Sequence, residues 1–276
     1  LEGGICVPAY DPRLSWRYSI GDFGFFKGGI GRFSQFPTPR QLSPDADGNP
    51  KLKAQQSTQL SLGYEQAVFS SVRLELTGYY NQLNDLVVGR EDRFRFFTGP
   101  PPIGPFDTEP YANASTGRIY GLETQIRYNG PNTIALIAAT FSRSERINRA
   151  GELRLFTYDQ PFVINALLSQ QLPKNWRLGS RLRYSAGNPY TPVVNRIYNL
   201  NERSFQPVYG PRDSVRIDPF FAIDVRIDRK YVFRTWSFTA YLDIQNVTYA
   251  KNVELMSWSY DYSQEEPIEG QPPLPA

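Results

Sequence analysis

The chain has 276 residues, of which 40% are hydrophobic and 14% aromatic, and its formal net charge is only +3. The abundance of aromatic residues argues against a disordered chain, and no apolar stretch reaches the ~20 residues of a membrane-spanning helix. With no histidine and a single cysteine, the sequence lacks the groups for imidazole-based catalysis, a cysteine metal site or an internal disulfide.

Hydrophobic and polar residues alternate along most of the chain, which is typical of strands with two unlike faces. We predict eleven strands, at residues 12–20, 23–33, 55–66, 69–88, 114–128, 132–144, 158–172, 175–186, 217–231, 235–247 and 252–263. Many of them reach ten residues, whereas strands of soluble proteins average about 5–6. Because ~9–11 tilted residues cross a bilayer, these lengths suit a membrane-spanning strand.

The predicted connections alternate in length along the chain. Short turns are expected at residues 21–22, 66–69, 129–132, 173–175 and 232–234, and long loops at residues 34–54, 89–113, 143–157 and 187–216. Short turns at one end and long loops at the other are typical of outer-membrane barrels. The pattern therefore predicts an all-β, antiparallel transmembrane β-barrel, with a soluble β-rich module as the alternative.

The alternation also assigns the two faces of the predicted strands. The lipid side is expected to carry Leu74, Leu76, Leu122, Ile126, Ile223, Val225 and Leu242. Acidic residues on the other side could resemble a catalytic carboxylate pair, namely Glu65 with Glu75 and Asp224 with Asp228. We interpret them as lumen charges paired with Arg73, Arg127 or Arg226, and we predict that the chain is not an enzyme.

Aromatic residues cluster near the ends of the predicted strands. Trp176 and Trp236 follow short turns, and Tyr64 and Tyr128 precede them. Tyrosine and tryptophan favour the membrane interface, so we interpret these residues as an aromatic girdle, together with the tyrosines of residues 260–262. Ordinary strand propensity is the alternative explanation.

Several segments resemble the barrel of TonB-dependent outer-membrane receptors. They include residues 11–18 (DPRLSWRY), 26–33 (FKGGIGRF), 48–51 (GNPK), 77–80 (TGYY), 84–87 (NDLV), 117–123 (GRIYGLE) and 241–249 (YLDIQNVTY). The resemblance implies that residues 1–276 are the C-terminal part of the barrel domain, with about eleven strands as roughly half of a 22-stranded barrel. The plug domain and the last strand have no counterpart here. An odd count of eleven would place the first and last strands parallel, which opposes closure into a smaller barrel.

The resemblance also implies a function and a set of partners. The expected protein is a receptor in the outer membrane of a Gram-negative bacterium that takes up a scarce nutrient, such as a ferric siderophore or a similar chelate. Its partners would be outer-membrane lipid, its own plug domain and N-terminal strands, and the TonB complex that acts through the plug. No cofactor, resident metal or nucleic acid is expected. A self-contained outer-membrane pore of about 12 strands stays open as an alternative.

Loop residues are the candidates for ligand contact, because arginine suits anionic groups and aromatic rings suit flat ones. We expect contact from Arg93, Phe94, Phe96, Phe97, Tyr190, Tyr198, Tyr209 and Arg212. Packing of these loops on one another is the alternative role. Interleaved arginine and phenylalanine can also bind single-stranded nucleic acid, but a loop on the cell surface has little access to it.

Overall fold

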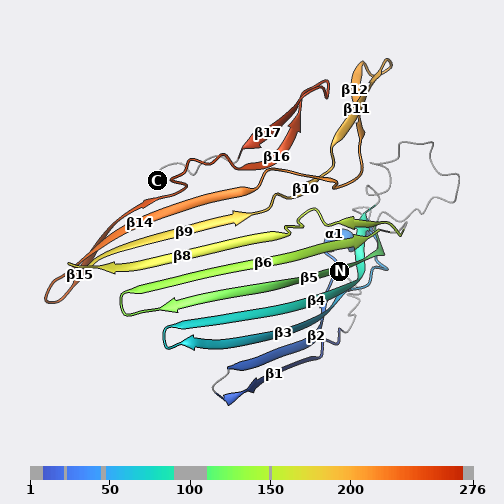
Figure 1. The fold of residues 1–276 in the computed structure, drawn as a ribbon. Helices are drawn as coiled ribbons and strands as arrows, with labels where there is room; N and C mark the ends of the chain where they lie inside the picture. Colours follow the sequence, from blue (N-terminus) through green and yellow to red (C-terminus); the bar gives the residue numbers. More distant parts are fainter. Residues whose placement is uncertain (1–8, 22–23, 45–47, 90–110, 149–150, 270–276) are drawn as a thin grey trace.

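The computed structural model describes residues 9–21, 24–44, 48–89, 111–148 and 151–269. One antiparallel sheet dominates it, in which ten strands each pair with the next along the chain (Figure 1). These strands are β1 (Arg13–Ser19), β2 (Phe25–Gln35), β3 (Gln55–Phe69), β4 (Val72–Gly89), β5 (Tyr111–Asn129), β6 (Thr133–Ile147), β8 (Phe162–Leu172), β9 (Trp176–Ser185), β14 (Phe220–Val232) and β15 (Ser237–Ile244). The short β7 (Leu153–Leu155) pairs with β6, and the one helix of the described residues is α1 (Pro39–Leu42). The all-β, antiparallel prediction is confirmed.

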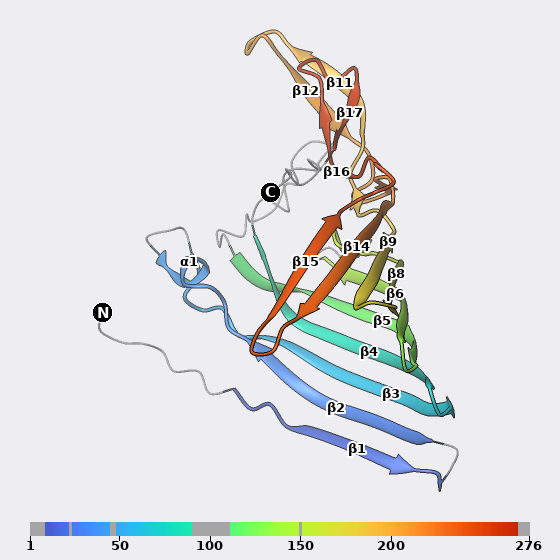
Figure 2. The ribbon, with the colours of Figure 1, turned by 90° about the vertical axis from the view of Figure 1, so that its left-hand side faces the viewer.

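The sheet is a single curved layer with β1 and β15 at its opposite margins (Figure 2). Among the residues that the structure describes, each of these two strands pairs on one side only. Leu52 and Ala222 are the only buried hydrophobic residues among those that the structure describes. A soluble sandwich would bury one face against a second sheet, so this alternative does not fit. No helix in the described ranges is long and apolar enough to cross a membrane.

The short and the long connections lie at opposite ends of the sheet, as predicted (Figure 1). The strand ends on one side are joined by tight turns, including residues 173–175, where Lys174 and Asn175 both adopt a φ of 60°. Some boundaries were misplaced. Since β3 runs on to Phe69, the turn predicted at residues 66–69 lies at residues 70–71, and the loop predicted at residues 143–157 lies between Ile147 of β6 and Phe162 of β8. The long connections all leave the opposite end, which we call the loop end.

The eleventh predicted strand, at residues 252–263, does not join the sheet. Instead β16 (Val253–Trp258) pairs with β17 (Glu265–Glu269) in a separate hairpin. The chain leaves β15 at Asn246, whose φ is 48° and whose side chain bonds both the N–H and the C=O of Ala250. The side chain of Asn252 then accepts a hydrogen bond from the N–H of Phe221 in β14. The segment is thus held beside β14, away from the open edge of β15.

The prediction that an odd number of strands opposes closure of the barrel is also wrong. Ten consecutive antiparallel strands, rather than eleven, make β1 and β15 antiparallel to each other. The strand count therefore does not oppose a closed barrel of ten strands. What opposes it is the position of these two strands at opposite margins of the sheet (Figure 2).

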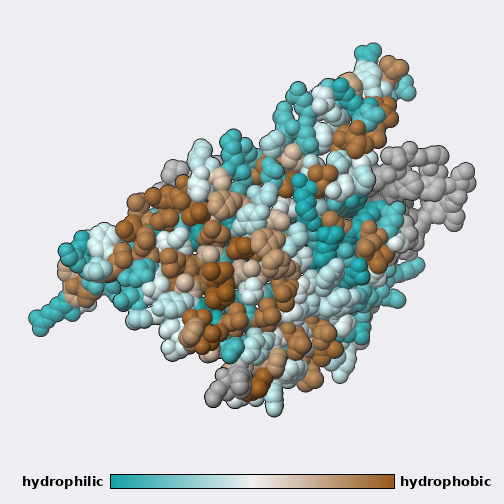
Figure 3. Space-filling model, in the orientation of Figure 1, coloured by the Kyte–Doolittle hydropathy of each residue, from teal (hydrophilic) through white to brown (hydrophobic). Residues whose placement is uncertain are grey.

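Strand register confirms the assignment of the apolar face. Leu62 lies opposite Gly78, which lies opposite Leu122, and Leu76 lies between Tyr64 and Thr124. All seven residues predicted for the lipid side share this face: Leu74, Leu76, Leu122, Ile126, Ile223, Val225 and Leu242. Hydrophobic residues gather over the middle of the sheet and hydrophilic ones toward the loop end (Figure 3). We call this face the outer face.

The opposite face carries paired charges. Glu65 Oε1 lies 3.3 Å from Arg73 Nη1, and Asp228 Oδ1 lies 2.9 Å from Arg226 Nη2. Asp224 accepts hydrogen bonds from two arginines of β9 and from the N–H of Asn246. These contacts support the interpretation of the carboxylates as paired wall charges. The partner of Glu75, however, is Lys27 rather than one of the predicted arginines.

Two glycines of the sheet give a matched test of its packing. A Cβ at Gly121 would overlap the carbonyl oxygen of Phe141 and lie 2.7 Å from Tyr79 Oη, whereas a Cβ at Gly78 would meet only the oxygen of Leu62 at 4.0 Å. We expect Gly121→Ala to destabilise the sheet by about 1–3 kcal/mol through overpacking. Gly78→Ala should leave stability nearly unchanged. Urea titration of heat-modifiable gel migration measures both, and equal stabilities for the two variants would contradict the packing described here.

Candidate functional site

Two small antiparallel strand pairs stand at the loop end, beyond β9 and β14 (Figure 1). The hairpin of β11 (Val193–Asn199) and β12 (Ser204–Tyr209) forms one pair. The strands that flank this hairpin in the chain, β10 (Pro189–Tyr190) and β13 (Val215–Arg216), pair with each other at its base. The sequence predicted a loop over residues 187–216 and missed both pairs. Four of the eight candidate ligand residues lie in this segment.

Two of these four residues lie at opposite ends of the β11–β12 hairpin. Tyr198 is near the tip, opposite Phe205, and the two rings meet edge to face at 5.0 Å. Tyr209 is at the base, opposite Val193. Tyr198 is 47% exposed and Tyr209 is 37% exposed, so both rings reach the surface, but they do not share one pocket.

The other two lie near the base. The N–H of Asp213 donates to Thr191 Oγ1 at 3.0 Å, which joins the backbone around Tyr190 to the backbone around Arg212. Arg212 Nε lies 3.4 Å from Asp213 Oδ2. The structure thus brings Tyr190, Arg212 and Tyr209 to the base of the hairpin and leaves Tyr198 at the tip.

The remaining four candidates are outside the described residues. Arg93, Phe94, Phe96 and Phe97 belong to residues 90–110. Their expected contact with ligand stays a prediction.

Tyr190 lies in a more apolar setting than a surface tyrosine. Desolvation by its surroundings, together with the carboxylate of Glu265 beside its hydroxyl, raises the pKa of Tyr190 to about 12. Both effects disfavour the phenolate. Tyr190 therefore presents a neutral hydroxyl at physiological pH.

This pKa predicts the alkaline behaviour of the hairpins. Since the folded-state pKa exceeds the usual 10, the stabilising contribution of Tyr190 is complete below pH 10 and is lost as the pH rises toward about 12. The difference in phenolate absorbance between the natural protein and Tyr190→Phe should show one group that titrates near pH 12, rather than near pH 10. A difference spectrum that titrates near pH 10 would contradict this environment.

An ion pair that the sequence did not reveal links two hairpins. Arg196 in β11 pairs with Asp261 in the turn between β16 and β17, and Arg196 Nη1 also donates to the Asp261 carbonyl at 2.9 Å. Hydrogen bonds from the hydroxyls of Ser263 and Ser259, with a further one from Arg196, lower the pKa of the Asp261 carboxyl. The tyrosines of residues 260–262 therefore belong to a turn, and their prediction as a strand-end girdle was wrong.

A buried carboxylate fixes the long loops to each other. Asp159 is only 1% exposed, pairs with Arg216 and accepts a hydrogen bond from the N–H of Ser144 in β6. Arg216 also donates to the carbonyl of Gly187 at 3.0 Å. This contact joins the loop after β6 to the strand pairs after β9, and no periodicity in the sequence pointed to it.

The loop end combines aromatic and cationic side chains. In the described part of the chain, no three Asp, Glu, His or Cys side chains gather as a metal site would require. Exposed tyrosines and arginines fixed by carboxylates offer flat apolar surfaces and cationic hydrogen-bond donors. Such a surface can bind a ligand that carries both aromatic and anionic groups.

Comparison with known proteins shows what the chain is similar to. A family model described as "TonB dependent receptor-like, beta-barrel" matches residues 8–247. No curated protein matches the sequence.

Similar solved structures share the fold at low sequence identity. A mutant of the ferric enterobactin receptor PfeA from Pseudomonas aeruginosa is 16% identical over 88% of this chain and 35% of that one, with a TM-score of 0.64. FpvA of P. aeruginosa bound to heterologous pyoverdines is 12% identical over 95% of this chain and 31% of that one, with a TM-score of 0.62. The FrpB iron transporter from Neisseria meningitidis is 12% identical over 94% of this chain and 37% of that one, with a TM-score of 0.60. The chain thus spans about a third of the length of these proteins.

Proposed function

Because the chain belongs to the TonB-dependent receptor-like β-barrel family, we propose that it forms part of the wall of a receptor in the outer membrane of a Gram-negative bacterium. The observation that carries this proposal is the open, single-layered sheet, with one apolar and one charged face and all its long loops at one end. The apolar face would contact lipid and the charged face would line the lumen.

Aromatic residues on the outer face support this placement. Tyr120 and Tyr128 lie on the outer face of β5, eight residues apart, with Leu122, Thr124 and Ile126 between them. Near the short turns Phe26 and Tyr64 contact each other at 5.1 Å, and Arg229 lies over the ring of Trp176. Amphipathic rings at two levels with an apolar band between them match the two interfaces of a bilayer.

We further propose that residues 1–276 form part of a larger barrel that is filled by a plug and coupled to TonB. The unpaired edges of β1 and β15 support the first step, because unpaired backbone groups in hydrocarbon cost several kcal/mol each. Additional strands would satisfy both edges. The charged face of Asp224, Glu65 and their arginines offers ion-pair partners to a polar domain inside the barrel. A self-contained pore would need β1 to pair with β15, and nothing in the structure favours that.

The proposed cargo is a ferric siderophore or a similar chelate. Solved structures with the same fold include receptors for ferric enterobactin and ferripyoverdine, and the loop end offers arginine and aromatic side chains of the kind that bind anionic, ring-containing ligands. We propose contact from Tyr190, Tyr198, Tyr209 and Arg212, and also from Arg93, Phe94, Phe96 and Phe97.

Uptake of radioactive iron tests this function. The whole receptor that contains residues 1–276 is produced in a Gram-negative host without siderophore receptors of its own. Ferric enterobactin, ferripyoverdine and other ferric siderophores are then supplied in turn. We expect uptake of at least one of them, and we expect deletion of TonB to abolish it. Absence of uptake for every chelate, or uptake that is indifferent to TonB, would overturn the proposal.

A further inference from the structure

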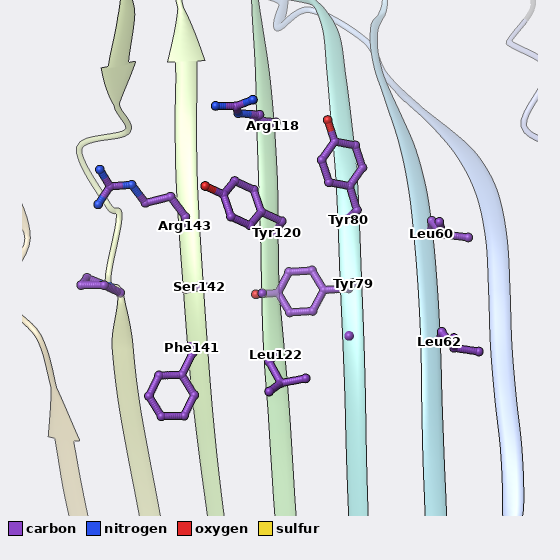
Figure 4. Close-up of a pocket in the computed structure, with 13 residues that line it drawn as sticks. Leu60, Leu62, Tyr79, Tyr80, Arg118, Tyr120, Leu122, Phe141, Ser142 and Arg143 are labelled. Carbon is purple, nitrogen blue, oxygen red and sulfur yellow. The ribbon is translucent and has the colours of Figure 1, made fainter.

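A groove runs across the outer face of β3, β4, β5 and β6, with a volume of about 1030 Å³ (Figure 4). Gly78 forms its floor, because Gly78 has no side chain and lies between Leu62 and Leu122 in the register. These two leucines are 57% and 42% exposed, and they form the walls. A slot one residue wide with aliphatic walls has the shape and polarity of an acyl chain.

The groove changes from apolar to cationic toward the loop end. Tyr80 and Tyr120 follow the leucines, with their rings stacked at 6.5 Å and an interplanar angle of 22°. Arg143 lies beside Tyr120, opposite it in the register, and Arg118 precedes Tyr120 by two residues toward the loop end (Figure 4). One continuous surface therefore offers an aliphatic slot and, toward the loop end, an aromatic rim with two guanidinium groups next to it.

A single buried carboxylate holds the two arginines. Glu145 accepts a hydrogen bond from Arg118 Nε at 2.5 Å, and its other oxygen lies 3.5 Å from Arg143 Nε. The Glu145 side chain is 9% exposed, whereas the arginine side chains are 45% and 43% exposed. The pairing uses the Nε atoms and leaves the terminal Nη groups at the surface. The other carboxylate nearby, Asp159, lies 4.0 Å from Arg143 Nη1 and is already paired with Arg216.

The position of Arg118, Arg143 and Glu145 along the strands fits the boundary between hydrocarbon and lipid headgroups. Arg118 lies eleven residues from the end of β5 at Asn129, and ~9–11 strand residues cross the hydrocarbon. The register places Arg118, Arg143 and Glu145 on the lipid-facing side of the wall. Two arginines against one carboxylate leave a positive excess at the level where lipid headgroups lie. An anionic headgroup would complement this charge.

We propose that this groove binds a phosphorylated lipid of the outer leaflet, lipid A, with a phosphate on the Nη groups of Arg118 and Arg143 and an acyl chain over Gly78. Guanidinium groups bind phosphate through paired, charge-assisted hydrogen bonds. The choice of lipid A rests on the proposed function, because an outer-membrane receptor with its loops outside has this end of the sheet in the lipid A leaflet.

Native mass spectrometry of the delipidated protein in detergent tests the proposal, with lipid A, dephosphorylated lipid A and phosphatidylethanolamine as probes. We expect lipid A to be retained and the other two lipids to be lost. The double variant Arg118→Gln, Arg143→Gln should bind lipid A about tenfold more weakly or worse. Gly78→Leu should also weaken binding by filling the slot, and a Cβ there meets no closer atom than 4.0 Å.

Arg229→Gln is the matched control, because Arg229 also lies on the outer face but at the end with the short turns. It should bind lipid A normally, and heat-modifiable migration should show that every variant is folded. Equal binding by the double variant, or equal retention of dephosphorylated lipid A, would overturn the lipid site and leave the uptake function standing. Loss of uptake with normal lipid A binding would instead count against the proposed cargo alone.

Discussion

Replacing Leu76 with arginine should sharply reduce the assembly of the protein in the outer membrane. Leu76 is 41% exposed on the outer face and lies opposite Thr124, midway between Tyr120 and Tyr128. A lipid-facing arginine at the bilayer midplane costs about 2–4 kcal/mol. We expect little heat-modifiable protein in the membrane fraction and a lower urea midpoint for the part that folds.

Gln125→Arg is the matched control. Gln125 lies one residue from the same level, but it points to the charged face, opposite Glu75 and near Glu123. A new arginine there would meet two carboxylates and water. Thr77 is a poorer control, because its hydroxyl is buried. Equal loss of assembly for Leu76→Arg and Gln125→Arg would contradict the assignment of the two faces.

Removal of the Asp159 carboxylate should loosen the loop end without disrupting the sheet. In Asp159→Ala, Arg216 loses its ion pair and the N–H of Ser144 loses its acceptor. Breaking a buried pair in this way costs about 3–5 kcal/mol, and the 26% exposure of the Arg216 side chain places the effect near the lower value. Protease added to intact cells should cut the loops around residues 151–161 and 186–219 much faster than in the natural protein.

Glu152→Ala provides the comparison for Asp159→Ala. Glu152 belongs to the same connection and pairs with Arg154, but its side chain is 60% exposed. An exposed pair contributes little to stability, so cleavage should proceed as in the natural protein. If Asp159→Ala also behaves like the natural protein, the carboxylate does not fix the loops.

Most of the sheet could be predicted because its signal is local. Alternation at a period of two reports which residues share a face, and the wall is one layer thick, so each strand carries its own pattern. The ten strands from β1 to β15 and the outer-face set with Leu76 and Ile223 follow from this pattern. The alternating lengths of the connections supplied the orientation of the strands.

The parts that could not be predicted depend on contacts between distant segments. The hydrophobic pattern of residues 252–263 is compatible with a wall strand, but the side chains of Asn246 and Asn252 direct the chain into a separate hairpin. Asp159 with Arg216 and Arg196 with Asp261 join residues that are 57 and 65 positions apart. Such pairs leave no periodic trace in one sequence.

The candidate site shows the same division. Residue type and the long predicted loops selected Tyr190, Tyr198, Tyr209 and Arg212. The structure places the three tyrosines in short strands at the loop end and Arg212 in the connection between β12 and β13. It also separates Tyr198 from the other three, which the sequence could not show. The outer-face arginines were missed because Arg118 and Arg143 interrupt the apolar pattern only where β5 and β6 extend beyond the predicted lipid band.

The orientation of the wall is the central claim, and labelling of single cysteines in intact cells tests it most directly. With Cys6 replaced by serine, one cysteine is placed at Asn201, at the tip of the β11–β12 hairpin, or at Lys174, in the short turn between β8 and β9. Both positions are exposed in the structure. An impermeant maleimide should label the Asn201 position in intact cells and the Lys174 position only after the outer membrane is opened. Labelling of Lys174 but not Asn201 in intact cells, or of both equally, would contradict a wall that spans the outer membrane with its long loops outside.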